Sequence, residues 1–169
     1  MSDFKKSTTG DFSAATEKGE CPLFISDEVS LTKGFQADPG EYWQGLGKQF
    51  IPSDELPGGK NVWLSVYVPE VATVGPHELD ANDRKYRASY AVGTFADFVT
   101  YFSTTGPMTL DVVPSDEDPR LEGRIEFTGK LQNGEQTVIV TKGEFKFSGL
   151  TKDLRDHGVG SIFFQLTHH

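Results

Sequence analysis

Large aromatic side chains that also carry a polar atom occur at two places in the first half of the chain, Tyr42-Trp43 and the pair Trp63 and Tyr67. Such rings can stack on a sugar or line an apolar pocket. Trp63 and Tyr67 share one face of a predicted strand, opposite a row of valines and a leucine. If solvent reaches that face, the rings form a ligand-binding platform. If a second sheet covers it, they belong to the core, where large aromatic side chains more often lie.

A candidate metal or acid/base site follows in a polar segment, where His77, Asp80 and Asp83 bring an imidazole and two carboxylates into a short stretch. Oxygen ligands of this kind suit Ca²⁺. The spacing does not fit an EF-hand loop, because Arg84 stands where another oxygen ligand is needed. A solvated connector between strands explains the same residues. The acidic run 116–118 is a second calcium candidate, and keeping a sheet edge soluble is its alternative role.

The common catalytic motifs are missing from the sequence: it has no Gly-x-Ser-x-Gly elbow, no phosphate-binding glycine loop and no His-Glu-x-x-His pattern. Cys21 could form a Cys-His nucleophile with His77 or His157. A lone cysteine is more often an inert thiol. We therefore predict no catalytic residue and no cofactor.

Charge limits the classes of partner. The chain has 25 acidic and 16 basic residues, a formal net charge of −9, which repels nucleic-acid phosphates and anionic membranes. We expect neither partner. Cys21 is the only cysteine, so no intramolecular disulfide can form and a reducing compartment is favoured. With no signal-peptide pattern and no apolar run of the ~20 residues that span a membrane, we expect a cytoplasmic protein, or a secreted one if a leader has been removed.

The elements that would position these residues are predicted to be β-strands. Residues 61–68 alternate valine and leucine with other side chains, and both faces are partly apolar, so this strand should be central. Residues 121–147 keep most of their apolar side chains at odd positions on both sides of Asn133-Gly134, which predicts a β-hairpin. Gly123 and Gly143 fall on the same face and would leave a gap beside Phe145 that another large side chain must fill. The alternative is that these glycines only bend the strands.

The turn of this hairpin has two candidate forms. A two-residue loop, Asn133-Gly134, would place Phe127 opposite Val140 and would need a bulge before Phe145. A three-residue loop with a G1 bulge would place Phe127 opposite Ile139. We favour the three-residue loop because it gives one continuous apolar face.

Shorter elements complete the prediction. They are strands at 98–102 and 108–113 joined by a turn into a second hairpin, one short helix at 151–157, and a last strand at 162–166. Residues 1–20 are polar and predict a partly disordered tail that leaves room for a short strand around Phe12. Residues 21–169 form a single all-β domain, an antiparallel β-sandwich of about nine or ten strands, with a flattened β-barrel as the alternative.

Several strands also carry a family resemblance. They are 62–69, the strand that holds Tyr90, 106–113, Leu121-Glu122-Gly123-Arg124-Ile125-Glu126-Phe127, and 138–147 with Lys142-Gly143-Glu144-Phe145. Together they resemble a diffuse family of bacterial β-rich proteins, often secreted or lipid-anchored, that has no assigned activity. The resemblance covers about the last two thirds of the chain and implies an all-β fold. It supplies no functional residue, and the lipobox cysteine of anchored members is missing here.

These observations favour a non-catalytic module that binds an unknown small molecule or protein, with Tyr42, Trp43, Trp63 and Tyr67 as ligand-binding candidates. The alternative is a hydrolase-like enzyme that acts on a small or carbohydrate substrate through the His77/Asp80/Asp83 segment. We expect a monomer or a weak homo-oligomer, and an exposed edge strand is the natural surface for self-association.

Overall fold

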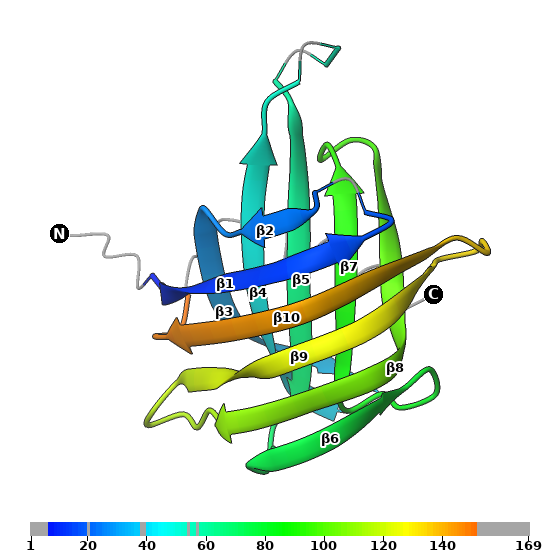
Figure 1. Ribbon diagram of the computed structural model, residues 1–169. Coiled ribbons are helices and arrows are strands. Elements are labelled where there is room, and N and C mark those ends of the chain that lie inside the picture. The colour runs from blue at the N-terminus through cyan, green and yellow to red at the C-terminus, as the bar shows by residue number, and fades with distance from the viewer. Residues whose placement is uncertain (1–6, 20, 38–39, 54, 57, 152–169) are drawn as a thin grey trace, which may run out of the picture.

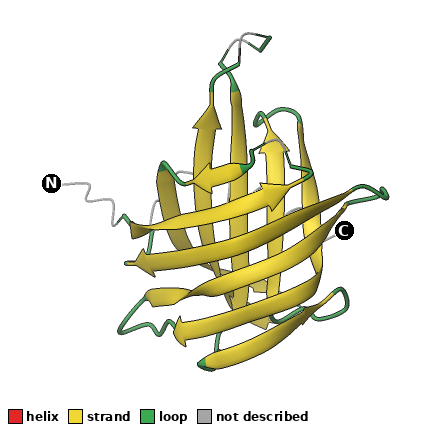
Figure 2. Cartoon of the chain, viewed as in Figure 1, coloured by secondary structure: helices red, strands yellow, loops and turns green. Residues whose placement is uncertain are grey.

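The computed structural model describes residues 7–19, 21–37, 40–53, 55–56 and 58–151. Within them the chain forms ten strands and no helix (Figure 2). The strands are β1 (Thr9–Glu17), β2 (Leu23–Ile25), β3 (Glu28–Gln36), β4 (Gly40–Ile51), β5 (Lys60–Pro69), β6 (Gly75–Asp80), β7 (Arg87–Gly93), β8 (Phe98–Val112), β9 (Arg120–Leu131) and β10 (Thr137–Ser148). Accordingly, the described residues contain no helix that could cross a membrane.

All ten strands belong to one antiparallel sheet, with the order β2-β1-β10-β9-β8-β7-β5-β4-β3 and with β6 paired to β8. The sheet curls into a half-barrel, so that β1, β10, β9 and the end of β8 cross in front of β3, β4, β5 and β7 (Figure 1). The main core lies on the inner face of this curl. The all-β antiparallel prediction is confirmed, and the finer choice between sandwich and flattened barrel stays a prediction.

Strand β8 joins the two parts of the sheet. The second hairpin predicted at 98–113 is wrong, because residues 98–112 form one continuous strand. Its first half pairs with β7, and its second half pairs with β6 along the same edge. Where β8 leaves β7, the backbone N–H of Ala88 donates to the Ser103 hydroxyl at 3.0 Å. The turn-forming residues at 103–107 therefore bend a paired strand instead of ending it.

The hairpin of β9 and β10 is confirmed, but the three-residue loop is wrong. β9 ends at Leu131 and β10 begins at Thr137, and Phe127 pairs with Val140. A bulge between Val140 and Gly143 then shifts the register before Phe145. The buried side chains explain this choice. Val138 and Val140 fill the inner face in place of Ile139, and the bulge returns the later phenylalanines to that face.

The predicted glycine gap is filled by Phe145 itself. Phe145 pairs with Gly123, and Gly143 pairs with Ile125, so the two glycines are not opposite each other. A Cβ on Gly123 would lie 2.9 Å from the Cζ of Phe145. The absence of a side chain at Gly123 thus makes room for the ring.

The inner core centres on three rings, Phe12, Phe145 and Phe147, whose centroids are 5.5 to 6.0 Å apart. Phe147 lies against Gly45 of β4, where an added Cβ would clash with its ring. Phe12 lies against Gly47, where an added Cβ would be 2.8 Å from the Phe12 Cβ. We call β1, β10, β9 and the end of β8 the front strands. The two glycines let the front strands β1 and β10 approach β4 closely.

The ends of the chain differ in how far the structure describes them. Phe12 lies in β1 and is fully buried, so part of the tail predicted for 1–20 is a core strand whose inward residues are Phe12, Ala14 and Thr16. Beyond Thr151, the predicted helix at 151–157 and the predicted strand at 162–166 lie outside the described residues.

Substitution of Gly45 tests the contact with Phe147. We expect Gly45→Ala to lower the free energy of unfolding by about 1–3 kcal/mol, because the methyl group overpacks the core. Phe147→Leu removes the ring, so the double variant should be more stable than the sum of the two single effects. Urea denaturation of all four proteins measures this coupling, and strictly additive effects would show that the ring and the glycine do not press on each other.

Candidate functional site

The structure separates the four aromatic residues that the sequence singles out. Trp43 faces the inner core, with the Lys33 ammonium 5.0 Å from its ring centroid. Tyr42, Trp63 and Tyr67 lie on the opposite, outer face of the same sheet. None of the four is more than 2% exposed. Their burial agrees with the core interpretation, and none of them presents a ring to solvent.

The outer face is defined here by the side chains of β4, β5, β7 and β8 that point away from the main core. They are Tyr42, Gln44, Leu46, Trp63, Ser65, Tyr67, Arg87, Ser89, Ala91, Phe98 and Thr100. Strand register places them side by side: Gln44 pairs with Tyr67, Tyr67 with Arg87, and Trp63 with Ala91. The outer face is therefore one surface that runs across four neighbouring strands.

One end of the outer face is polar and carries a cation. The Arg87 guanidinium lies over the Tyr67 ring, 4.7 Å from its centroid, and Nη2 donates to Gln36 Oε1 at 3.2 Å. The side-chain amide of Gln44 donates to the Tyr67 hydroxyl and to the Ser65 hydroxyl, each at 3.3 Å. A guanidinium that stacks on a ring in this way can still bind a planar anion through the N–H groups at its edge.

Burial controls the ionisation of this polar end. Removal from water raises the pKa of Tyr67, while Ser89, Arg87 and Ser65 act in the opposite direction. Burial also raises the pKa of Tyr42, and Tyr67 adds to that effect. Burial lowers the pKa of Arg87, against the effect of Tyr67. Because a guanidinium stays protonated in proteins, Arg87 is a partly desolvated positive charge that lies over the ring of Tyr67.

The other end of the outer face is apolar. Trp63 packs with Leu46, Ala91 and Phe98, and its ring centroid is 5.6 Å from that of Phe95 and 5.8 Å from that of Phe98. Trp63 and Tyr67 are four residues apart on β5, a separation of about 13 Å in a strand. The outer face thus offers an aromatic site and a cationic site about 13 Å apart.

Most side chains of the outer face are buried, whereas Arg87 and Phe98 are partly exposed. All described strands belong to one sheet, and the main core occupies its other face. Yet Gln44 is 2% exposed, and Ser65 and Ser89 are 0% exposed. Among the described residues, Nε of Arg87 and Oγ1 of Thr100 are buried and have no hydrogen-bond partner. Buried polar groups without partners are uncommon and indicate a binding surface or a strained site.

The predicted metal residues do not converge. The ring of His77 stacks on Tyr86 at a centroid distance of 3.8 Å, and its Nε2 lies 2.7 Å from the Thr73 carbonyl oxygen. Asp80 accepts a hydrogen bond from the Asn82 backbone, and Asp83 accepts one from the Lys85 backbone. Within the described ranges, no group of three His, Cys, Asp or Glu side chains could hold a metal ion. His77 lies within β6, Asp80 ends that strand, and Asp83 belongs to the turn that follows it.

Cys21 has the surroundings of an inert thiol. Its sulfur donates to the Leu23 carbonyl at 3.0 Å and to the Gln49 side chain at 3.3 Å. Burial raises the pKa of the thiol, against the effect of the Leu23 backbone. A raised pKa leaves little thiolate at neutral pH, which opposes a nucleophilic role.

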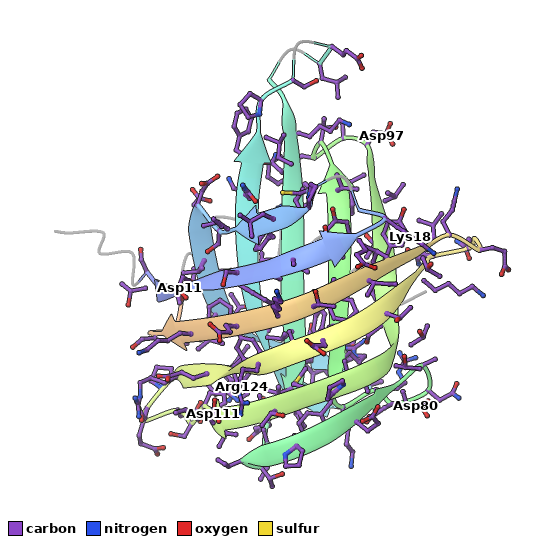
Figure 3. The ribbon with its side chains drawn as sticks, viewed as in Figure 1. Asp11, Lys18, Asp80, Asp97, Asp111 and Arg124 are labelled. Carbon is purple, nitrogen blue, oxygen red and sulfur yellow. The ribbon has the colours of Figure 1, made fainter. Side chains whose placement is uncertain are left out.

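The front strands carry an open depression of about 500 Å³ beside the β10 bulge. Its rim has Arg124 and Lys142 together with Glu126 and Glu144. Nη2 of Arg124 lies 3.5 Å from Oδ1 of Asp111 (Figure 3). Glu126 accepts a hydrogen bond from the backbone N–H of Lys142. Because acidic groups accompany the basic ones, this rim has no clear preference for a charged ligand.

Arg87 and Gln44, the charged and amide groups of the outer face, are not among the residues predicted from the sequence. A signal for them does exist. Gln44, Ser65 and Ser89 are polar residues at alternate positions of strands whose other positions are apolar, and Arg87 lies on the same face of β7 as Ser89. Only the register between strands brings these positions together, and no single segment of sequence supplies that register.

Removal of the Tyr67 hydroxyl tests the buried network. We expect Tyr67→Phe to cost about 1–2 kcal/mol of unfolding free energy, because Gln44 loses a buried acceptor. The matched control is Tyr86→Phe, whose hydroxyl accepts an exposed bond from Thr73. That substitution should cost less than about 0.5 kcal/mol. The free energies of unfolding are measured by thermal and urea denaturation. If Tyr67→Phe and Tyr86→Phe lower them equally, the Tyr67 network contributes no more stability than an exposed hydrogen bond.

Known proteins give no guide to this surface. No protein-family model, no curated protein and no solved structure matches the chain. The resemblance to bacterial β-rich proteins therefore stays an expectation. The geometry of the outer face carries the functional interpretation.

Proposed function

We propose that this protein is a non-catalytic interaction module that binds a polypeptide segment on its outer face. The observation that carries the proposal is the cluster of Trp63, Tyr67 and Arg87 on one face of the sheet, opposite the main core. An ordinary solvent-facing sheet surface is wet and polar. A surface built from Trp63, Tyr67 and Arg87 has the residue types that dominate binding energy at protein interfaces.

The shape of the surface favours a polypeptide over a small molecule. Small ligands bind in concave pockets that enclose most of their surface. Two depressions on the described part of the chain, around Lys142 and around Asn133, lie away from the outer face. An outer face that crosses four strands suits a segment that places one side chain at Trp63 and another at Arg87. Arg87 selects a carboxylate, and Trp63 selects an aromatic or aliphatic group.

The enzyme alternative draws no support from this geometry. His77, Asp80 and Asp83 are each engaged with nearby backbone or ring partners, and neither depression is lined by them. General acid/base catalysis requires such groups to converge on one reacting atom. We therefore rank binding above hydrolysis.

Selection from a displayed library of short random peptides tests this function. We expect the bound peptides to share a carboxylate and an aromatic or aliphatic side chain, separated by enough residues to span about 13 Å. Arg87→Gln should weaken the binding of a selected peptide about 10-fold or more, because the carboxylate loses its charged partner. Fluorescence anisotropy measures the affinity.

The control for this experiment is Arg124→Gln, which removes a side chain that is 61% exposed on the front strands. It should leave the affinity unchanged. The proposed function fails if no peptide is selected, or if Arg87→Gln and Arg124→Gln have the same effect.

A further inference from the structure

We infer that the free edge of β2 is a self-association surface, to which β2 of a second copy adds as an antiparallel strand once a cap formed by the side chains of Gln49 and Cys21 is displaced. β2 is the last strand on one side of the sheet, and no described strand pairs with its other edge (Figure 1). The unpaired backbone groups of such an edge are a template for another strand. This surface is separate from the outer face, which β4, β5, β7 and β8 form.

The pairing of β2 with β1 shows which backbone groups face the free edge. The Pro22 carbonyl accepts a hydrogen bond from β1 at 2.9 Å, and the Ser26 N–H donates to β1 at 3.0 Å. Because backbone polar groups point to alternate sides along a strand, those of Phe24 also face β1. The N–H and C=O groups of Leu23 and Ile25 therefore face the free edge.

Two side chains cap these groups in place of a neighbouring strand. The Ile25 N–H donates to Oε1 of Gln49 at 3.0 Å, and the Cys21 thiol donates to the Leu23 carbonyl at 3.0 Å. The thiol sulfur is also 3.3 Å from the same Gln49 oxygen. Gln49 belongs to β4, and its amide oxygen takes the place of a backbone acceptor. The hydrogen bond of Ile25 is exposed, so an incoming strand can compete for it.

The side chains of β2 suit a second copy of the same strand. Leu23 is 61% exposed and Ile25 is 54% exposed. In a twofold antiparallel pair centred on Phe24, Leu23 of each copy lies opposite Ile25 of the other, and both pairs are of the hydrogen-bonded kind. The exposed apolar side chains then pack as cross-strand pairs on one face. The contact is self-complementary, as a twofold interface requires.

The two other edge strands of the described sheet are protected differently. β6 contains Pro76, which has no N–H, and the exposed side chain of Glu78. β3 carries the charged side chains of Glu28 and Lys33. Proline and charge are usual devices against edge pairing. β2 has neither within its three residues, so its protection depends on its short length and on the cap.

The association is weak and depends on salt. Three residues pair in each copy, far fewer than at an interface of standard size. Each chain carries a formal net charge of −9, so two copies repel each other, and salt screens this repulsion. The cap opposes association further, because each copy must break the hydrogen bond between Ile25 and Gln49.

Removal of the Gln49 amide tests the cap. We expect Gln49→Leu to tighten self-association about 10-fold or more, because the Ile25 N–H of each copy then lacks its acceptor within the chain. Sedimentation velocity over a series of protein concentrations measures the dimer dissociation constant, and about 0.5 M salt should tighten it further. The matched control is Gln136→Leu, which adds the same side chain in the exposed turn between β9 and β10 and should associate like the unmodified chain.

A lysine on β2 identifies the surface. In Gln49→Leu/Ile25→Lys a charged side chain falls within the apolar pairs, so the tightening should be lost. The inference is overturned if Gln49→Leu keeps its far-UV circular dichroism but associates no more than the unmodified chain. Equal association of Gln49→Leu with and without Ile25→Lys overturns it as well, because the contact would then lie elsewhere.

A second variant covers loss of the fold. If Gln49→Leu loses its circular dichroism, Cys21→Ala, which removes the donor to the Leu23 carbonyl, is measured in its place with and without Ile25→Lys. The same two results decide the inference. The proposed function is tested separately, because β2 contributes no side chain to the outer face.

Discussion

The curl of the sheet depends on the contact between two phenylalanine rings and two glycines. Phe147 of β10 lies against Gly45, and Phe12 of β1 lies against Gly47. Because β4 has no side chain at these two positions, the front strands can cross it at close range. Side-chain and backbone hydrogen bonds follow, such as the bond from the backbone N–H of Leu31 to the Thr8 hydroxyl at 2.8 Å. The two parts of the sheet thereby enclose one core.

The strands behind the curl are β3, β4, β5 and β7 (Figure 1). Their inner face is already filled by the side chains of the main core. Val62, Leu64 and Val66 of β5 point into the core and are 0% exposed. The opposite side of β5 is not needed to hold the front strands, and polar residues on it carry a desolvation cost unless they have partners. Under the proposed function, the stacked guanidinium of Arg87 on β7 and the amide of Gln44 on β4 serve as recognition groups. Fold and proposed function use opposite faces of the same strand.

The sequence predicts the local elements far better than their pairing. Alternation identified β5 and the hairpin of β9 and β10, because each pattern is complete within one segment. The predicted three-residue loop was wrong because the parity of apolar residues alone cannot locate the bulge between Val140 and Gly143. The predicted turn at 103–107 was wrong for a related reason. Residues in that stretch pair with β6 on one edge and with β9 on the other, so they continue the strand. For the site, the aromatic residues were visible in sequence, but Arg87 gains its meaning only from strand register.

The most direct measurement is the acrylamide quenching of Trp63 as the only tryptophan, in a chain that carries Trp43→Phe. Binding of a selected peptide that carries a carboxylate and an apolar side chain should change the emission and the quenching constant of Trp63, and Arg87→Gln should abolish that change at the same peptide concentration. Peptide binding that leaves both properties of Trp63 unchanged would contradict the outer face as the surface that holds the polypeptide.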